Sequence, residues 1–195
     1  MELNNIKGDI GAIGSLLVDI DGKPIHSSGP FLKASYDILF IIKKYIKPRT
    51  RKKEKLFFEQ NENAFAVDYI TGADLFISYE IFKFLNGFDE RFFMYCEETD
   101  LQLRMKRLSL KRLIIKGPEI VHFEGSSFNY IQKKSNLRRI LIDTSYFIYF
   151  KKNSNLLTYY IYRLLFIVIR FIAIIDNSYT PRERIDYLKN LTKKV

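Results

Sequence analysis

The segment from Leu156 to Ile175, LLTYYIYRLLFIVIRFIAII, restricts the possible folds of this chain more than any other feature. It is twenty residues long, which is enough to span a bilayer by length. Arg163 and Arg170 lie seven residues apart, so they share one helical face, and a central arginine is costly in hydrocarbon. Two interpretations stay open: an amphipathic helix in the plane of a lipid interface, or a helix packed on a protein core.

The part of the chain before this segment alternates between strand and helix patterns, which indicates an α/β fold. We expect strands at residues 10–18, 64–70, 112–116 and 119–123, and helices at 37–46, 78–86 and 97–108. Asp21-Gly22 is typical of a hairpin turn, and Ser78 of a helix N-cap.

The residue pattern changes after Ser126, which predicts two regions. Residues 1–130 would form the α/β region, and residues 131–195 a helical, membrane-associated tail of amphipathic helices. Thr180, Pro181 and Glu183 form a capping box with proline at the first helical position, which predicts a last polar helix.

The net charge and the cysteine content restrict the partners and the cellular compartment expected for the protein. The net charge is +10, from 32 basic and 22 acidic residues, and it is concentrated in the run from Lys43 to Lys55. Such a run suits an anionic lipid surface, a phosphate-bearing substrate or nucleic acid, but also a solvated loop. The single cysteine, Cys96, excludes an internal disulfide and a cysteine-based metal cage, which fits a reducing cytosolic setting.

Three acids follow an aromatic run in GFDERFFMYCEETDLQLR. On a helix, Glu97 and Asp100 share a face, and Glu98 points about a quarter-turn away. Spacing alone favours compensation of the helix dipole. The aromatic run favours a second role, because it could desolvate a carboxylate and raise its pKa to a value useful for a base.

The order of motifs between residues 70 and 127 points to a family. Gly-Ala follows a strand; then come a short helix, Gly-Phe-Asp-Glu, an aromatic pair, an acidic pair, Asp-Leu, Arg and a strand that ends in His. This order resembles the C-terminal half of the catalytic domain of family 2 glycosyltransferases, especially rhamnosyltransferase-like and galactofuranosyltransferase-like members. The resemblance covers about residues 8–127 and implies a partial GT-A-type (nucleotide-diphospho-sugar transferase) fold with a mixed sheet.

The resemblance implies roles for individual residues. The second acid of the pair, Glu98, would be the general base that deprotonates the acceptor hydroxyl, in a position where many members have Asp. His122 would join a metal site, although a lone strand histidine is more often structural and a ligand would need carboxylate partners. Substrate-binding positions would be Thr71, Gly72, Ala73, Asp89, Glu90, Glu97 and Asp100. Arg104 also matches the pattern, and we expect it to be structural.

The family also has an N-terminal half that binds the nucleotide and carries an Asp-x-Asp metal motif. Asp19-Ile20-Asp21 matches this motif. Because Gly22-Lys23 follows it, we instead expect this segment to form the hairpin turn. We therefore expect the nucleotide-binding half to be missing from this chain, and expect the chain alone to be inactive. A divalent metal, Mn or Mg, is expected in the complete enzyme and is not expected to bind this chain tightly.

The resemblance implies an inverting transfer from a nucleotide-sugar donor to a lipid-linked surface glycan. The partners would be that donor, that acceptor, a membrane surface, and the N-terminal half as a separate chain if the enzyme is split; nucleic acid is not among them. The expected location is cytoplasmic, at the inner face of the bacterial plasma membrane. The alternative is a basic module without catalysis that binds nucleic acid or anionic membranes.

Overall fold

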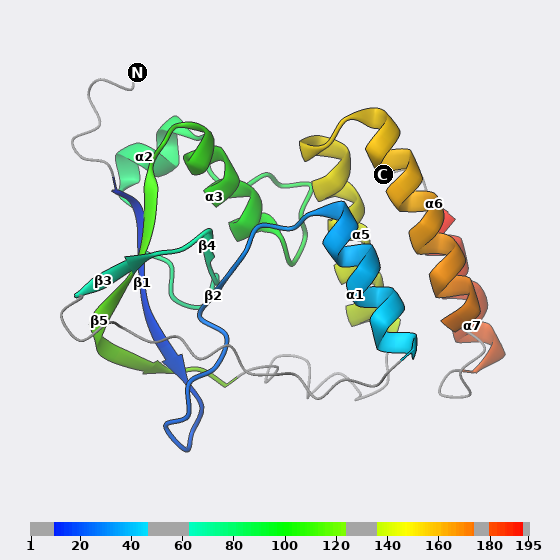
Figure 1. The fold of residues 1–195 in the computed structure, drawn as a ribbon, viewed down its shortest axis with the longest axis horizontal. Helices are drawn as coiled ribbons and strands as arrows, with labels where there is room; N and C mark the ends of the chain where they lie inside the picture. The colour runs from blue at the N-terminus through cyan, green and yellow to red at the C-terminus, as the bar shows by residue number, and fades with distance from the viewer. Residues whose placement is uncertain (1–9, 47–62, 124–135, 174–179, 193–195) are drawn as a thin grey trace. The chain divides into compact units, whose positions relative to one another are not determined.

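The computed structural model describes residues 10–46, 63–123, 136–173 and 180–192. The chain divides into two compact units (Figure 1). One unit contains the described strands and two helices, and the other is helical. The α/β class expected from the sequence is confirmed.

The larger sheet is a mixed sheet built around β5 (Lys111–Val121). On one side β5 pairs in parallel with β1 (Ile10–Val18), and on the other side antiparallel with β3 (Ala64–Ala66). A second, two-stranded sheet joins β2 (Ser28–Gly29) to β4 (Tyr69–Ile70). β4 ends at the turn that begins with Thr71, where the sequence placed part of the site.

Two strand predictions were wrong in detail. Residues 112–116 and 119–123 were expected as separate strands, but β5 runs through them with an irregularity in its pairing to β1 after Gly14. Gly117 has a φ of 145° at this point, a conformation that a side chain would oppose. The expected strand at 64–70 is divided into β3 and β4, because the two halves pair with different partners.

The turn after β1 forms as the sequence predicts. Asp19 Oδ1 accepts hydrogen bonds from the backbone N–H groups of Asp21 (3.0 Å) and Lys23 (2.8 Å), and Gly22 has a φ of 71°. The carboxylate of Asp19 is therefore used inside the turn. The returning arm is short, with an isolated bridge between Val18 and Pro24.

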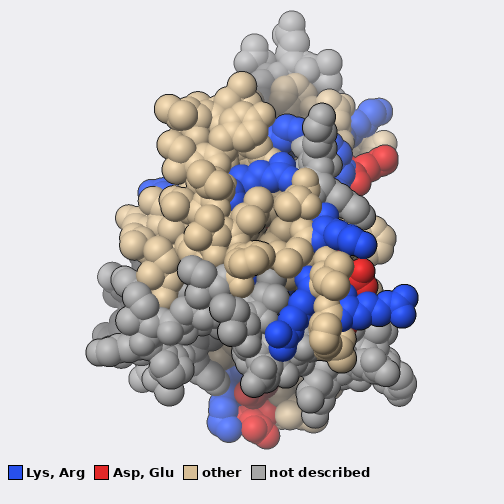
Figure 2. Space-filling model, turned by 90° about the vertical axis from the view of Figure 1, so that its right-hand side faces the viewer, with Lys and Arg blue, Asp and Glu red and all other residues tan. Residues whose placement is uncertain are grey.

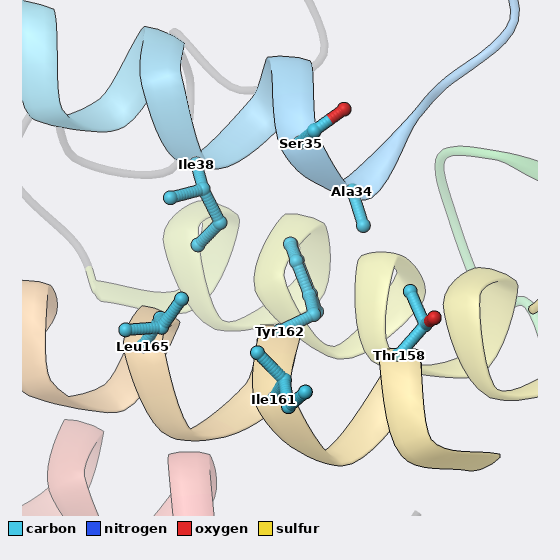
Figure 3. Close-up of a pocket in the computed structure, with 7 residues that line it drawn as sticks. All are labelled: Ala34, Ser35, Ile38, Thr158, Ile161, Tyr162 and Leu165. Atoms are coloured by element: carbon cyan, nitrogen blue, oxygen red, sulfur yellow. The ribbon is translucent and has the colours of Figure 1, made fainter. Parts of the chain in front are cut away.

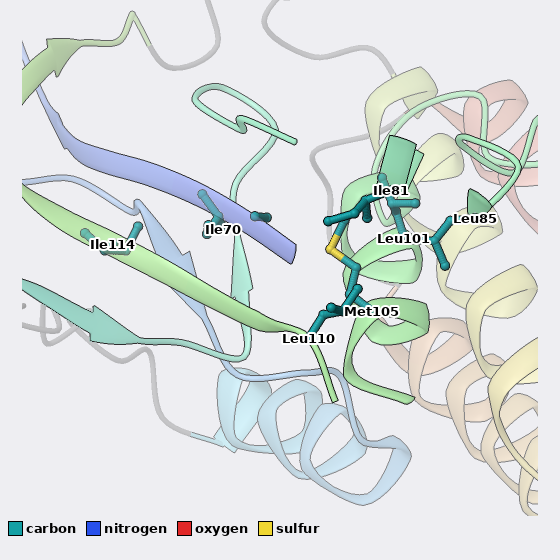
Figure 4. Close-up of a cluster of buried hydrophobic side chains, with 8 residues drawn as sticks. Ile70, Ile81, Leu85, Leu101, Met105, Leu110 and Ile114 are labelled. Atoms are coloured by element: carbon teal, nitrogen blue, oxygen red, sulfur yellow. The ribbon is translucent and has the colours of Figure 1, made fainter. Parts of the chain in front are cut away.

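Helices α2 (Tyr79–Phe84) and α3 (Glu97–Arg107) complete the α/β unit. The Ser78 hydroxyl accepts the Ile81 N–H at 3.2 Å, which confirms the predicted N-cap. The helices pack on the strands through an apolar core (Figure 4). Its buried members are Ala12, Ile70, Ile81, Leu85, Leu101, Met105, Leu110 and Ile114.

The helical unit consists of α1 (Ala34–Ile46), α5 (Asn136–Asn153), α6 (Leu156–Ala173) and α7 (Pro181–Thr192). Helix α6 packs against the other three. The sequence grouped α1 with residues 1–130, whereas the structure places it in the helical unit, together with residues 91–96. Thr180 and Glu183 form the predicted capping box. None of the helices in the described ranges is long and apolar enough to cross a membrane.

Candidate functional site

Helix α3 is fixed to the end of β4 by one buried amide. Gln102 Oε1 accepts the Ile70 N–H at 2.8 Å, and Gln102 Nε2 donates to the Ile70 carbonyl at 2.7 Å. The same Nε2 also donates to the carbonyl of Glu98 at 3.2 Å. Because the turn at Thr71 follows Ile70 directly, this amide sets the position of the turn relative to the first turn of α3.

The turn after β4 lies against Glu98. A Cβ atom at Gly72 would lie 3.8 Å from both Cβ and Cγ of Glu98 and 4.0 Å from its Cδ. Gly72 and Ala73 are exposed, and Thr71 is half-buried. The structure thus brings together two positions 26 residues apart, Gly72 and Glu98, that the family resemblance placed in one site.

The carboxyl group of Glu98 is desolvated. Burial and, to a smaller extent, the negative charge of Glu97 raise the pKa of Glu98 to about 7, although backbone hydrogen bonds oppose the rise. Its Oε2 atom is buried without a hydrogen-bond partner among the residues that the structure describes. Near neutral pH such a carboxyl group is present in both protonation states and can accept a proton.

Two further side-chain oxygens in this unit are buried without a hydrogen-bond partner among the described residues. They are Oε2 of Glu97 and Oγ1 of Thr71. Burial raises the pKa of Glu97 as well. Buried polar atoms in folded proteins are nearly always hydrogen-bonded, so three such oxygens in the turn and helix that meet at Gly72 suit a polar ligand.

Asp100 has a structural partner. Its side chain is fully buried, and Arg104 Nε lies 3.0 Å from its Oδ2. Arg104 also donates to the backbone carbonyls of Leu85 and, at 2.8 Å, Gly87. The Asp100–Arg104 pair therefore holds the end of α2 to α3, which agrees with the structural role expected for Arg104.

The loop between α2 and α3 carries the other predicted positions. Asp89 is half-buried and Glu90 is exposed, just after Gly87 with its φ of 66°. Tyr95 and Cys96, directly before α3, have φ values of 70° and 67°. Left-handed backbone at two consecutive non-glycine residues is strained, and such strain clusters at functional sites.

The metal role expected for His122 stays a prediction. His122 lies just past the end of β5, with its backbone N–H bonded to the Val18 carbonyl at 2.9 Å. In the parts of the chain that the structure describes, no group of three His, Cys, Asp or Glu side chains is placed to hold a metal ion.

Two positioning residues were missed from the sequence. Gln102 is fully buried, and Asp74 accepts a hydrogen bond from the Ser15 N–H, which joins the turn to β1. A signal for Gln102 existed, since it stands one helical turn after Glu98 beside the apolar Leu101. Asp74 had no such signal, because its partner lies 59 residues away.

A short stretch of the chain is similar to a known protein. The rhamnosyltransferase WbbL of Escherichia coli (strain K12) is 32% identical over 57 residues. The likeness is to a glycosyltransferase. It covers 29% of this chain and 22% of that protein, so the chain matches about a fifth of the relative's length. No family model matches the chain, and no solved structure matches it.

Proposed function

We propose that this chain forms the acceptor side of an inverting glycosyltransferase with a GT-A-type fold, similar to the family 2 rhamnosyltransferases. The donor would be a nucleotide sugar, and the acceptor a lipid-linked surface glycan. The proposal rests on the short likeness to a rhamnosyltransferase and on the chemistry of the Glu98 carboxyl group.

The observation that carries the proposal is the state of Glu98. A general base works best when its pKa lies near the operating pH, and burial raises the pKa of Glu98 to about 7. Its buried Oε2 has no donor from the described residues, so it can receive a proton from a ligand hydroxyl. The exposed turn at Gly72 gives such a ligand access to the same place.

In the proposed reaction, Glu98 Oε2 takes the proton of an acceptor hydroxyl. The acceptor oxygen attacks the anomeric carbon of the donor sugar, and the bond from that carbon to the nucleotide diphosphate breaks with inversion. Thr71 and Glu97 would hold other acceptor hydroxyls through their buried oxygens. Asp89, Glu90 and Ala73 would line the sugar pocket.

Asp100 would act indirectly in this scheme, because its carboxylate already holds Arg104. A divalent metal would need ligands beyond those that the described residues supply, and the roles above do not depend on one. The proposed setting is the cytoplasmic face of a bacterial plasma membrane.

The test is the substitution Glu98→Gln in a reconstituted enzyme that includes a nucleotide-sugar-binding half. Glutamine keeps the shape of the side chain but cannot accept the proton, so transfer should fall by about 10²- to 10⁴-fold. Glu80→Gln, on the exposed first turn of α2, is the matched control and should leave transfer unchanged. Normal transfer by Glu98→Gln would remove Glu98 from the role of base.

The non-catalytic alternative makes a different prediction. A nucleic-acid-binding module would bind single-stranded or duplex nucleic acid with strong salt dependence, and Glu98→Gln would not affect it. Most of the basic run from Lys43 to Lys55, which motivated this alternative, lies outside the described residues. Three acids at the start of α3 would repel a phosphate backbone.

A further inference from the structure

Helix α6 has an outward face without any charge. The side chains of Tyr159, Tyr162 and Phe166 are buried, and each is at most 2% exposed. The other side of the helix is exposed and entirely apolar or aromatic. Its members are Leu156, Leu157, Tyr160, Ile161, Leu164, Leu165, Val168 and Phe171.

Both charged residues of α6 are bonded within the helical unit. Arg163 donates to the Tyr159 hydroxyl at 2.9 Å and to the Leu191 carbonyl at 3.2 Å. Arg170 donates to Asp143 Oδ1 at 3.0 Å, and only 13% of its side chain is exposed. Both charges of α6 are thus bonded within the helical unit and its exposed side is apolar, whereas the exposed side of a helix on a water-soluble protein is usually charged or polar.

Helix α1 packs against α6 and also has exposed apolar side chains. Tyr36, Leu39 and Phe40 of α1 are all exposed. The groove between α1 and α6 has a volume of about 280 Å³ (Figure 3). It is lined by Ala34, Ser35, Ile38, Thr158, Ile161, Tyr162 and Leu165. Exposed apolar side chains that gather on one face often mark a site of association.

The charges around this face indicate what covers it. Asp143 is the only acid in α5 and α6, and it is 1% exposed and paired with Arg170. Arg138 and Lys151 of α5 are exposed. Figure 2 shows several Lys and Arg side chains, with fewer Asp and Glu side chains among them, beside a broad uncharged surface. A partner that has a negatively charged surface and an apolar interior complements such a surface.

We propose that the apolar face of α6, together with the groove between α6 and α1, docks onto an anionic lipid bilayer. Helix α6 would lie in the plane of the interface, with Leu164 and Val168 in the acyl region, and the groove would receive part of a lipid chain. Anionic headgroups would be attracted by the positive charge of α5, to which the exposed Arg138 and Lys151 contribute. A second copy of the chain fits less well, because pairing two such faces would bring like charges together.

The docking surface does not depend on the transfer chemistry, since vesicle binding requires neither donor nor acceptor. The test is co-sedimentation with vesicles of phosphatidylcholine alone or mixed with phosphatidylglycerol. Wild-type protein should bind the anionic vesicles and lose affinity as salt is raised. Leu164→Glu with Val168→Glu should bind them about tenfold more weakly or worse, because carboxylates are costly in the acyl region.

The matched control is Tyr79→Glu, which changes an aromatic side chain that is 70% exposed at the start of α2, in the other unit. It should bind vesicles like the wild type. Equal binding by the wild type and the Leu164/Val168 double variant would overturn the proposal. So would a wild-type dimer that the double variant dissociates, since a second copy would then cover the face.

A second measurement avoids dependence on the folding of charged variants. The chain contains no tryptophan, so Leu164→Trp provides a single fluorescent reporter on the apolar face. Its emission should shift to the blue with anionic vesicles and be quenched by brominated lipid chains. Unchanged emission with these vesicles would place Leu164 outside the bilayer and contradict the proposal.

Discussion

At the level of single residues, the protonation of Glu98 should control transfer. The pKa of its carboxyl group is raised to about 7 by burial and by Glu97, and a base acts only when deprotonated. Transfer should therefore rise with pH and level off above the pKa, with a midpoint near 7. The measurement is the pH profile of the transfer rate at low substrate concentration. A midpoint near 4.5, the ordinary value for glutamate, would mean that Glu98 is not desolvated in the working enzyme.

A substitution at Gly72 should affect transfer without affecting the stability of the fold. A Cβ added there would meet Glu98 at ordinary contact distances of 3.8–4.0 Å, so Gly72→Ala should change the free energy of unfolding by less than about 0.5 kcal/mol. The methyl group would nevertheless occupy the space beside the carboxyl group, so transfer should fall.

Gly14→Ala is the contrasting variant. Its Cβ would lie 2.5 Å from Ile70 Cγ2 and 2.7 Å from the Asp74 carbonyl oxygen, so the variant should lose about 1–3 kcal/mol of stability. Urea unfolding should show a loss of stability in Gly14→Ala and almost none in Gly72→Ala. Transfer assays, run where both variants are folded, should show the larger loss in Gly72→Ala. A strongly destabilised Gly72→Ala would show that the turn is tighter than the structure indicates.

At the level of elements, the contact between α3 and β4 depends on Gln102. Gln102→Leu keeps the volume approximately but leaves the buried N–H and C=O of Ile70 without their partners. Unfolding should become easier by about 1–3 kcal/mol for each buried polar group left unsatisfied. Hydrogen exchange at Ile70 should accelerate in the variant. Unchanged exchange there would mean that another group fixes the end of β4.

The sequence predicted those elements whose signals are local. The caps at Ser78 and Thr180 and the turn at Asp21-Gly22 depend on neighbours within a few residues, and all three are confirmed. Strand pairing depends on distant partners. For this reason the division of residues 64–70 and the continuity of β5 across Gly117 could not be read from the local pattern.

The site was predictable only in part, for the same reason. Spacing within one helix suggested the acids of α3. It could not show that Asp100 would pair with Arg104, or that Oε2 of Glu98 would have no hydrogen-bond partner among the described residues. The proximity of Gly72 to Glu98 came from the family resemblance and is seen in the structure. The metal role of His122 stays a prediction, because the described residues offer it no set of partners.

At the level of the whole molecule, both units bury ionisable acids. In the α/β unit, burial raises the pKa of Glu97 and Glu98. In the helical unit, burial raises the pKa of Asp37, which accepts a hydrogen bond of 2.6 Å from Tyr162, and of Asp143, which is paired with Arg170. Because all four pKa values are raised, the stability of the folded protein should depend on pH.

A carboxyl group whose pKa is higher in the folded state binds more protons folded than unfolded in the interval between the two values. Stability then falls as pH rises through that interval. For Glu98 the interval runs from about 4.5 to about 7, and its contribution is on the order of 2 kcal/mol. The melting temperature should therefore rise by several degrees when pH is lowered from 8 to 5, whereas acid normally destabilises proteins through carboxylates with depressed pKa values.

The melting series should be recorded at about 0.3 M salt, because protonation increases the net charge of a chain that already carries +10 and the added repulsion would oppose the effect. Glu98→Gln cannot ionise, so it should melt at a higher temperature than the wild type at pH 8 and at nearly the same temperature at pH 5. Glu80→Gln should follow the wild type throughout, since its side chain is exposed. If the melting temperature of the wild type fell steadily from pH 8 to 5, the buried acids would not titrate above their ordinary range. The basis for Glu98 as a base at neutral pH would then be lost, whatever the outcome of the vesicle experiments.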